Sequence, residues 1–149
     1  MNIFVGADHG GFKYKQAVLQ EIQDLGHKAV DKGAFELDPD DDYPEYGFLV
    51  AEAVSEEPDQ SKGILLCRSG GGMTIAANKV KGVRAVQARS SEEVLHACLH
   101  NNANVLTLSA DWTSEPEVLE LVEIFLSTHF SDEARHQRRV EQITAYESK

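Results

Sequence analysis

Short apolar runs alternate with longer segments in which apolar residues recur every three or four positions. The apolar runs are typical of strands that are buried on both faces of a sheet, and the longer segments are typical of amphipathic helices. The predicted strands cover residues 2–7, 27–33, 62–67, 82–88 and 103–110. The predicted helices cover residues 11–26, 45–56, 73–80, 90–102, 115–130 and 131–148.

The regular alternation of strand and helix predicts one α/β domain over residues 1–149, built on a mostly parallel five-stranded sheet with helices on both faces. In such sheets, ligands bind beyond the carboxyl ends of the strands. We therefore expect functional side chains in the loops 7–10, 67–72 and 109–112, and we place the segment that begins at His100 near the same edge.

Composition and charge narrow the class of protein. The chain carries 25 acidic and 14 basic residues and a net charge of -11, which disfavours nucleic acid or an anionic membrane as the partner. No apolar run is long enough to span a bilayer, and no secretory signal is visible at the start. Two cysteines make no disulfide framework. We expect a cytoplasmic protein in a reducing compartment.

The segment CRSGGGM, residues 67–73, places a thiol at the end of an apolar strand and three glycines after it. The glycines expose consecutive backbone N–H groups, and with the helix that follows they predict an anion site and a thiol of lowered pKa. The spacing excludes a Cys-x5-Arg phosphatase loop, a Walker A loop and the dinucleotide fingerprint. A structural cysteine, a nucleophile paired with a histidine, and a general base remain open.

Three other segments carry candidate chemistry. Asp8 and His9 follow the first strand and offer an acceptor for hydroxyls and a donor for a phosphate, although Asp8 could equally cap a helix. His96 and His100 have helical spacing, but Ala97 stands where a zinc protease has its glutamate, so we expect no metal. The basic run RHQRR, residues 135–139, is either a solvated helix face or an anion site.

Five segments of the chain, in order, resemble the type B ribose-5-phosphate isomerase family, which includes the galactose-6-phosphate isomerase subunits. These segments are GADHGGFKYKQ, DDDYPEYG, GILLCRSGGGMTIAANKVKGVRA, HNNANVL and RHQRRV. The resemblance implies a Rossmann-like three-layer αβα sandwich. It also implies an aldose–ketose isomerase that works through a cis-enediol without metal or organic cofactor. The expected assembly is a homodimer, possibly within a tetramer, whose active sites are shared between subunits.

The resemblance also implies residue roles. Cys67 matches the base that carries a proton between C1 and C2, and His100 matches the acid that opens the furanose ring with help from Asp8. The segment from Ser69 through Gly70 and Gly71 to Gly72 matches the anion hole for the enediolate oxygen. The remaining matches are substrate contacts: hydroxyl contacts at Tyr43 and Asn101, and phosphate contacts at His9, Arg135, His136 and Arg139.

Two positions depart from the family pattern. Arg68 stands where the family usually has glycine, and Asp111 stands where we expect a phosphate-binding arginine. Our hypothesis is that Arg68 replaces that arginine as an oxyanion or phosphate ligand. The leading substrate is ribose 5-phosphate. The alternatives are an allose or galactose 6-phosphate type of substrate, a non-catalytic sugar-phosphate-binding protein, and a thiol hydrolase.

Overall fold

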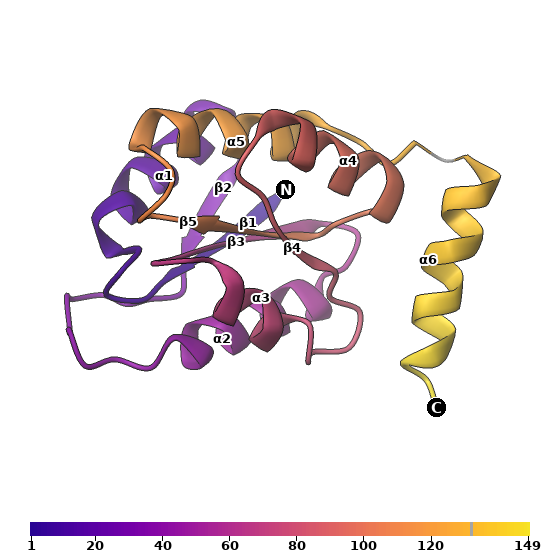
Figure 1. Ribbon diagram of the computed structural model, residues 1–149, viewed down its shortest axis with the longest axis horizontal. Coiled ribbons are helices and arrows are strands. Elements are labelled where there is room, and N and C mark those ends of the chain that lie inside the picture. The colour runs from indigo at the N-terminus through magenta and orange to yellow at the C-terminus, as the bar shows by residue number, and fades with distance from the viewer. Residues whose placement is uncertain (132) are drawn as a thin grey trace.

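The computed structural model describes residues 1–131 and 133–149, which form a five-stranded sheet between two layers of helices (Figure 1). The sheet is parallel throughout and has the strand order β2-β1-β3-β5-β4. The strands are β1 (Asn2–Ala7), β2 (Lys28–Asp31), β3 (Ser61–Cys67), β4 (Ala85–Gln87) and β5 (Val105–Ser109). The helices are α1 (Phe12–Asp24), α2 (Tyr43–Glu56), α3 (Gly71–Ala77), α4 (Ser91–Asn101), α5 (Glu115–Ser127) and α6 (Ala134–Tyr146).

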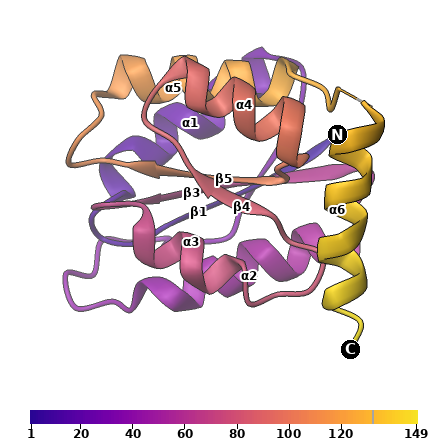
Figure 2. The same ribbon diagram turned by 45° about the vertical axis from the view of Figure 1, so that its right-hand side comes forward.

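The two faces of the sheet are covered by different helices (Figures 1 and 2). Helices α1, α4 and α5 pack on one face, and α2 and α3 pack on the other. This arrangement confirms the predicted α/β sandwich, and the predicted mostly parallel sheet is entirely parallel. The predicted edge strands 27–33 and 82–88 are longer than the observed ones, because the ladder pairing covers Lys28–Asp31 in β2 and Ala85–Gln87 in β4.

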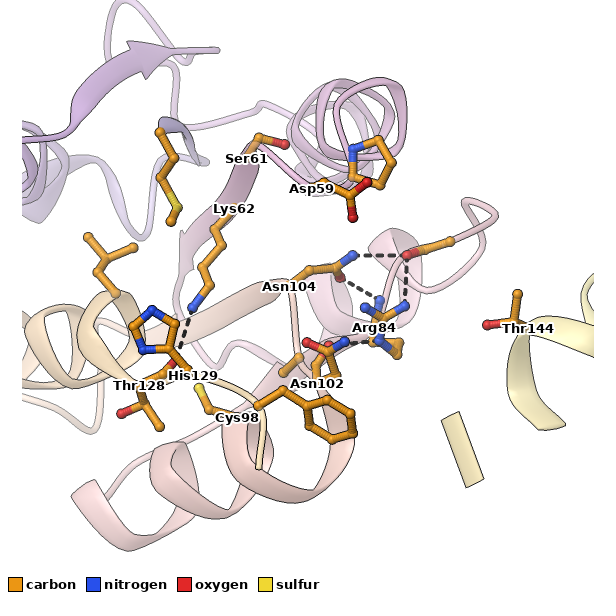
Figure 3. Close-up of a pocket in the computed structure, with 16 residues that line it drawn as sticks. Asp59, Ser61, Lys62, Arg84, Cys98, Asn102, Asn104, Thr128, His129 and Thr144 are labelled. Carbon is orange, nitrogen blue, oxygen red and sulfur yellow. Dashed lines mark hydrogen bonds between the residues drawn. The ribbon is translucent and has the colours of Figure 1, made fainter. Parts of the chain in front are cut away.

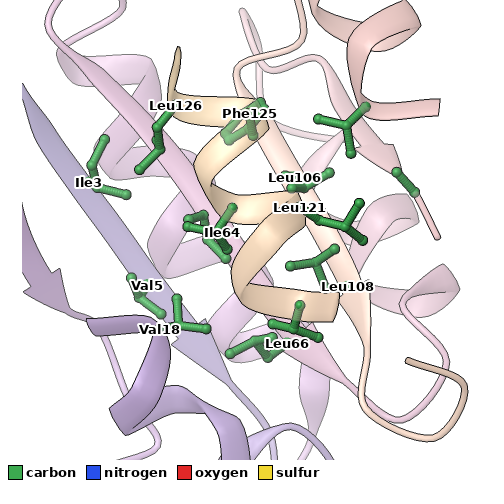
Figure 4. Close-up of a cluster of buried hydrophobic side chains, with 14 of the residues drawn as sticks. Ile3, Val5, Val18, Ile64, Leu66, Leu106, Leu108, Leu121, Phe125 and Leu126 are labelled. Carbon is green, nitrogen blue, oxygen red and sulfur yellow. The ribbon is translucent and has the colours of Figure 1, made fainter. Parts of the chain in front are cut away.

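The hydrophobic core consists of two clusters that the sheet separates. Successive side chains of a strand point to opposite faces, so Ile64 and Leu66 join the larger cluster under α1, α4 and α5 (Figure 4). Leu65 and Cys67 point the other way, into the smaller cluster under α2 and α3. The strand that ends in the thiol is thus covered on both faces, as its continuous apolar run predicts.

Helix α6 stands beside the sandwich and covers neither face of the sheet (Figures 1 and 2). It packs against α4, and His136 is its one buried residue in the described part of the chain. Ile143 and Tyr146 are 50% and 73% exposed. The helix predicted over 131–148 begins later, at Ala134, and residue 132 lies outside the described residues. None of the described helices combines the length and apolar character needed to cross a bilayer.

Candidate active site

The carboxyl ends of β1, β3 and β5 lie side by side, so the loops that follow them meet at one edge. Strand pairing places Ala7 beside Leu66 and Cys67 beside Ser109. Strand β1 is also the point from which the chain winds toward both edges of the sheet, which is where open parallel sheets bind ligands. The predicted meeting of the loops 7–10, 67–72 and 109–112 is confirmed.

The Cys67 thiol lies at the bottom of this site and is 5% exposed. The Gly70 N–H donates to its Sγ at 3.0 Å. Burial raises the pKa of the thiol above its ordinary value, and the backbone N–H of Gly70 only partly opposes that effect. The expected lowering of this pKa is therefore wrong, because the sequence shows the N–H donors of the turn but not the depth of the sulfur.

The glycine-rich turn is held open by contacts with two side chains. Gly70 has φ of +89°, a conformation that favours glycine, and Gln87 Nε2 donates to the Ser69 carbonyl at 2.5 Å. A Cβ at Gly72 would lie 2.6 Å from the Tyr43 ring, so this glycine lets the tyrosine lie directly on the turn. The structure thus brings Tyr43 to the turn, as a substrate contact requires. Gln87 was not predicted, because a polar residue in a short edge strand has no motif around it.

Asp8 is 4% exposed, and its carboxylate organises the loop after β1. Its Oδ1 accepts hydrogen bonds from Gly10 N–H at 2.9 Å and Gly11 N–H at 3.0 Å, in the turn before α1. The N-cap of α1 is Gly11 and no side chain caps the helix, so Asp8 is not the capping residue that the sequence left open. Burial raises the pKa of Asp8 despite these bonds, and the Asp8 charge in turn raises the pKa of Cys67. Asp8 and Cys67 are therefore electrostatically coupled.

His9 lies beside them and is paired with Asp41, a residue of the loop before α2. The ring Nδ1 of His9 is 2.6 Å from Asp41 Oδ1, and the His9 backbone N–H also donates to the Asp41 carboxylate. This hydrogen bond is the main reason that the pKa of His9 is raised. Asp41 was not predicted, because three consecutive aspartates give no sign of which side chain turns inward.

Arg68 and Asp111 face each other across the same edge. Arg68 Nε is 3.1 Å from Asp111 Oδ2, and the Asp111 backbone N–H donates to the Arg68 carbonyl. The stem of Arg68 runs over Gly10, where a Cβ would overlap it. Arg68 and Asp111, the two residues that differ from the family pattern, therefore form an ion pair with each other. The Arg68 guanidinium extends from its own loop to the position that Asp111 occupies in the neighbouring loop.

The second group of expected site residues lies at the other end of the sheet, which corrects our placement of His100. Helix α4 runs back across the sheet, so its last residues His100 and Asn101 precede β5 at the amino edge. The β3 residue at that edge is Gly63, and from it the strand rises roughly 13 Å to Cys67. Any residue that directly precedes a parallel strand lies at the amino edge, so the alternation itself contradicts our placement.

Of the residues expected from α6, His136 lies against His100. The His100 ring stacks on the buried His136 ring at 4.3 Å and meets the His96 ring edge-on at 4.1 Å. Arg135 is exposed and pairs with Glu133 at 2.8 Å, and Arg139 is exposed as well. Burial, followed by the charges of the neighbouring histidines, lowers the pKa of His100. One chain therefore holds the two groups of expected site residues at opposite edges of its sheet.

A pocket of about 460 Å³ opens near the amino edge, between α6 and the sandwich (Figure 3). Its two cations donate to carbonyls of the chain: Lys62 to Phe125 and Thr128, and Arg84 to Asn102 and Gly82. The principal polar groups of this pocket therefore have partners within the chain, and their bonds tie the ends of α4 and α5 to the sheet. We therefore interpret this pocket as a structural feature and not as the substrate site.

One group of described residues has metal-ligand chemistry. Ligand atoms of Asp8, His9 and Asp41 lie within 4.8 Å of one another. Atoms of these side chains already hydrogen-bond within the protein: Asp8 Oδ1 accepts from backbone N–H groups, and His9 Nδ1 is paired with Asp41. To bind a cation, these three residues would have to give up those hydrogen bonds. That no metal binds here stays a prediction.

The sequence and the fold both match known proteins over nearly the whole chain. The family model described as Ribose/Galactose Isomerase matches residues 3–143. Ribose-5-phosphate isomerase B of Mycolicibacterium paratuberculosis is 40% identical over 147 residues, which cover 99% of this chain and 92% of that protein. The crystal structure of ribose-5-phosphate isomerase B from Mycoplasma genitalium with bound ribulose-5-phosphate superposes with a TM-score of 0.96. It is 40% identical, over 99% of this chain and 97% of that one. Type B ribose 5-phosphate isomerase from Trypanosoma cruzi has a TM-score of 0.94 at 34% identity, over 99% of both chains.

The shared fold and the identity over nearly the whole chain define a sugar-phosphate isomerase. The chain belongs to the ribose/galactose isomerase family.

Proposed function

We propose that the protein interconverts ribose 5-phosphate and ribulose 5-phosphate, with Cys67 as the base. The observation that carries this proposal is the Cys67 sulfur, buried at the carboxyl edge with the Gly70 N–H pointing at it. The relative from Mycoplasma genitalium, whose structure holds ribulose-5-phosphate, has the same fold at 40% identity. These two findings support a five-carbon substrate and a site built around the thiol.

The proposed chemistry needs a base and a set of donors. The Cys67 thiolate takes the proton from C2 of the open-chain aldose, and the electron pair moves onto the C1 carbonyl oxygen to give a cis-enediolate. The thiol returns the proton to C1 while the proton of the C2 hydroxyl is transferred to the C1 oxygen, which leaves a ketone at C2 and a hydroxyl at C1. Backbone N–H groups of residues 69–72 stabilise the enediolate oxygen. A raised thiol pKa makes the thiolate a stronger base, although less of it is present at neutral pH.

Each active site is shared between two copies of the chain in this proposal. Cys67 and Asp8 come from one subunit, while His100 comes from its partner and opens the furanose ring. The support is geometric: the two half-sites lie at opposite edges of one sheet, so a single chain cannot close them around one sugar. The apolar side chains Ile143 and Tyr146 of helix α6 are 50% and 73% exposed, as expected for a helix that packs on a second copy.

The remaining contacts follow from this assembly. Tyr43 and the partner subunit's Asn101 bind the sugar hydroxyls. The phosphate is bound by His9 and Arg68 of one subunit together with arginines of the partner's α6, because an arginine fork matches phosphate oxygens. The α6 residues assigned to the phosphate are Arg135, His136 and Arg139.

Solvent deuterium tests the reaction. The wild-type protein should exchange deuterium into C2 of ribose 5-phosphate and produce ribulose 5-phosphate, and Cys67→Ala should lose both activities. Cys98→Ala is the matched control, because Cys98 is the second buried cysteine and points into the other core cluster. Full turnover by Cys67→Ala would overturn the base assignment, and binding of the sugar phosphate without exchange would identify a non-catalytic protein.

Subunit mixing tests the shared site. Cys67→Ala and His100→Ala are each expected to be inactive, and a hybrid dimer of the two has one intact site out of two. After denaturation and refolding of an equal mixture, about a quarter of the wild-type activity should return. No recovery, with hybrid dimers shown by mass spectrometry, would contradict a site made from two subunits.

Asp111 favours one alternative substrate class. An acidic side chain at the phosphate end could bind the hydroxyls of a longer sugar, as in allose or galactose 6-phosphate. A panel of five- and six-carbon aldoses, with and without phosphate, decides between these substrates by the ratio of kcat/KM values.

A further inference from the structure

The Asp41 carboxylate makes three hydrogen-bonding contacts with His9. Its Oδ1 lies 2.6 Å from the His9 ring Nδ1, and the His9 backbone N–H lies 3.2 Å from Oδ1 and 3.0 Å from Oδ2. A carboxylate can only accept hydrogen bonds, so the ring Nδ1 must carry a proton and donate it. The three contacts fix both the backbone and the ring of His9, and they leave the ring Nε2 without a partner among the described residues.

The two side chains of this pair differ in their access to solvent. The Asp41 side chain is 5% exposed, and the His9 side chain is 32% exposed. The Asp41 carboxylate is therefore shielded from solvent. Its interaction with His9 is screened less by salt and water than that of an ion pair at the surface. The exposed part of the imidazole opens onto the carboxyl edge that also holds Asp8 and Cys67.

Three charged groups act on His9 from the elements around it. The Asp41 hydrogen bond is the largest influence and raises the pKa of His9, and the Asp8 charge raises it further. Burial and the Arg68 guanidinium act in the opposite direction, and the net pKa is above the ordinary value. Burial and then the Asp41 charge raise the pKa of Tyr46 to about 12, so this neighbour stays a neutral phenol and adds no charge at physiological pH.

We propose that Asp41 is a positioning residue that holds His9 as an imidazolium and leaves its Nε2–H to bind the phosphate of the substrate. This role rests on the proposed function for the identity of the ligand. It adds a fixed positive charge to the phosphate end, where Arg68 shares its own charge with Asp111. The arrangement resembles the carboxylate partners that fix the tautomer of functional histidines in general.

The first experiment measures the pair directly. NMR titration of the His9 ring in the wild type, Asp41→Asn and Asp40→Asn reports its protonation without any need for turnover. Asp40 is the matched control, because it is the adjacent aspartate of the same loop and is exposed. The His9 titration midpoint should fall in Asp41→Asn and stay near the wild-type value in Asp40→Asn. Equal midpoints in all three proteins would overturn the proposal.

The second experiment separates positioning from mere structural support. KM for ribose 5-phosphate should rise several-fold in Asp41→Asn at about pH 7.5 and much less at about pH 5.5, where His9 is protonated in both proteins. The change should lie in KM, with kcat little altered. In a His9→Gln background, Asp41→Asn should change KM no further, because Asp41 acts through His9. A full additional loss in that background would refute the role.

Inorganic phosphate keeps this proposal separate from the isomerase proposal. Phosphate should perturb the His9 ring resonances of the wild type more strongly than those of Asp41→Asn at neutral pH. If the protein binds phosphate in this way but shows no isomerisation, the proposed reaction fails and the role of Asp41 stands. If phosphate leaves His9 unperturbed in every variant, the role of Asp41 fails whatever the reaction is.

Discussion

Arg68 provides the sharpest test of how this chain binds a phosphate. We expect Arg68→Gly to raise KM for ribose 5-phosphate, because it removes a guanidinium from the edge where we propose that the phosphate binds. A hydrogen bond to a charged group contributes about 1.5–3 kcal/mol. That loss corresponds to a rise in KM of roughly 10- to 150-fold if the guanidinium binds the phosphate directly.

The stability of the fold should change far less. Arg68 and Asp111 have side-chain exposures of 68% and 38%, and ion pairs in water at such exposure contribute about 0–1 kcal/mol. The new glycine adds a backbone cost of roughly 0.5–1 kcal/mol. Urea unfolding should therefore show a shift of no more than about 2 kcal/mol, which separates a binding defect from unfolding.

The assay is steady-state kinetics on three proteins. Arg68→Gly should have the raised KM, and the double variant Arg68→Gly/Asp111→Arg should recover much of it, because the guanidinium then returns from the other loop. Arg89→Gly is the matched control, since Arg89 is an exposed arginine at the same edge that stacks on Trp112 at 4.7 Å. An unchanged KM in Arg68→Gly, or a double variant no better than the single one, would refute the reasoning.

Two further predictions concern the turn and the thiol. Gly70→Ala should lower the free energy of unfolding by about 1–3 kcal/mol because φ is +89°, whereas Gly71→Ala, whose Cβ would meet no atom closer than 3.7 Å, should change it by no more than about 1 kcal/mol. Chemical denaturation measures both, and equal losses would contradict the role of the positive φ. Burial raises the pKa of Cys67, so kcat/KM should keep rising with pH through neutrality as the thiolate fraction grows; a profile that is flat from about pH 7 would rule the thiolate out as the base.

The sequence predicts the sheet and its ligand-binding edge because both depend on local patterns. A continuous apolar run such as 62–67 identifies a strand covered on both faces, and parallel strands bring their carboxyl ends to one edge. The loops that carry His9 and Cys67 therefore meet as expected. His100 does not, because α4 spans roughly 16 Å and carries the chain back to the amino edge before β5 begins.

Properties that depend on depth or on a single side-chain direction were not predictable. The glycines after Cys67 predict backbone N–H donors near the thiol. Only the packing of α2 and α3 shows that the sulfur is buried and that its pKa is raised. Likewise the run of aspartates before α2 shows neither that Asp42 precedes the helix as its N-cap nor that Asp41 turns inward to His9. Both outcomes are set by tertiary contacts between segments far apart in the chain.

The burial of Cys67 also bears on how the protein withstands oxidants. Peroxides and alkylating agents attack thiolates that they can reach, and this sulfur is both 5% exposed and mostly protonated at neutral pH. The second cysteine, Cys98, is also buried, and burial raises its pKa as well. The proposed base is therefore expected to resist oxidation to the sulfenic and sulfinic acids that disable exposed catalytic cysteines.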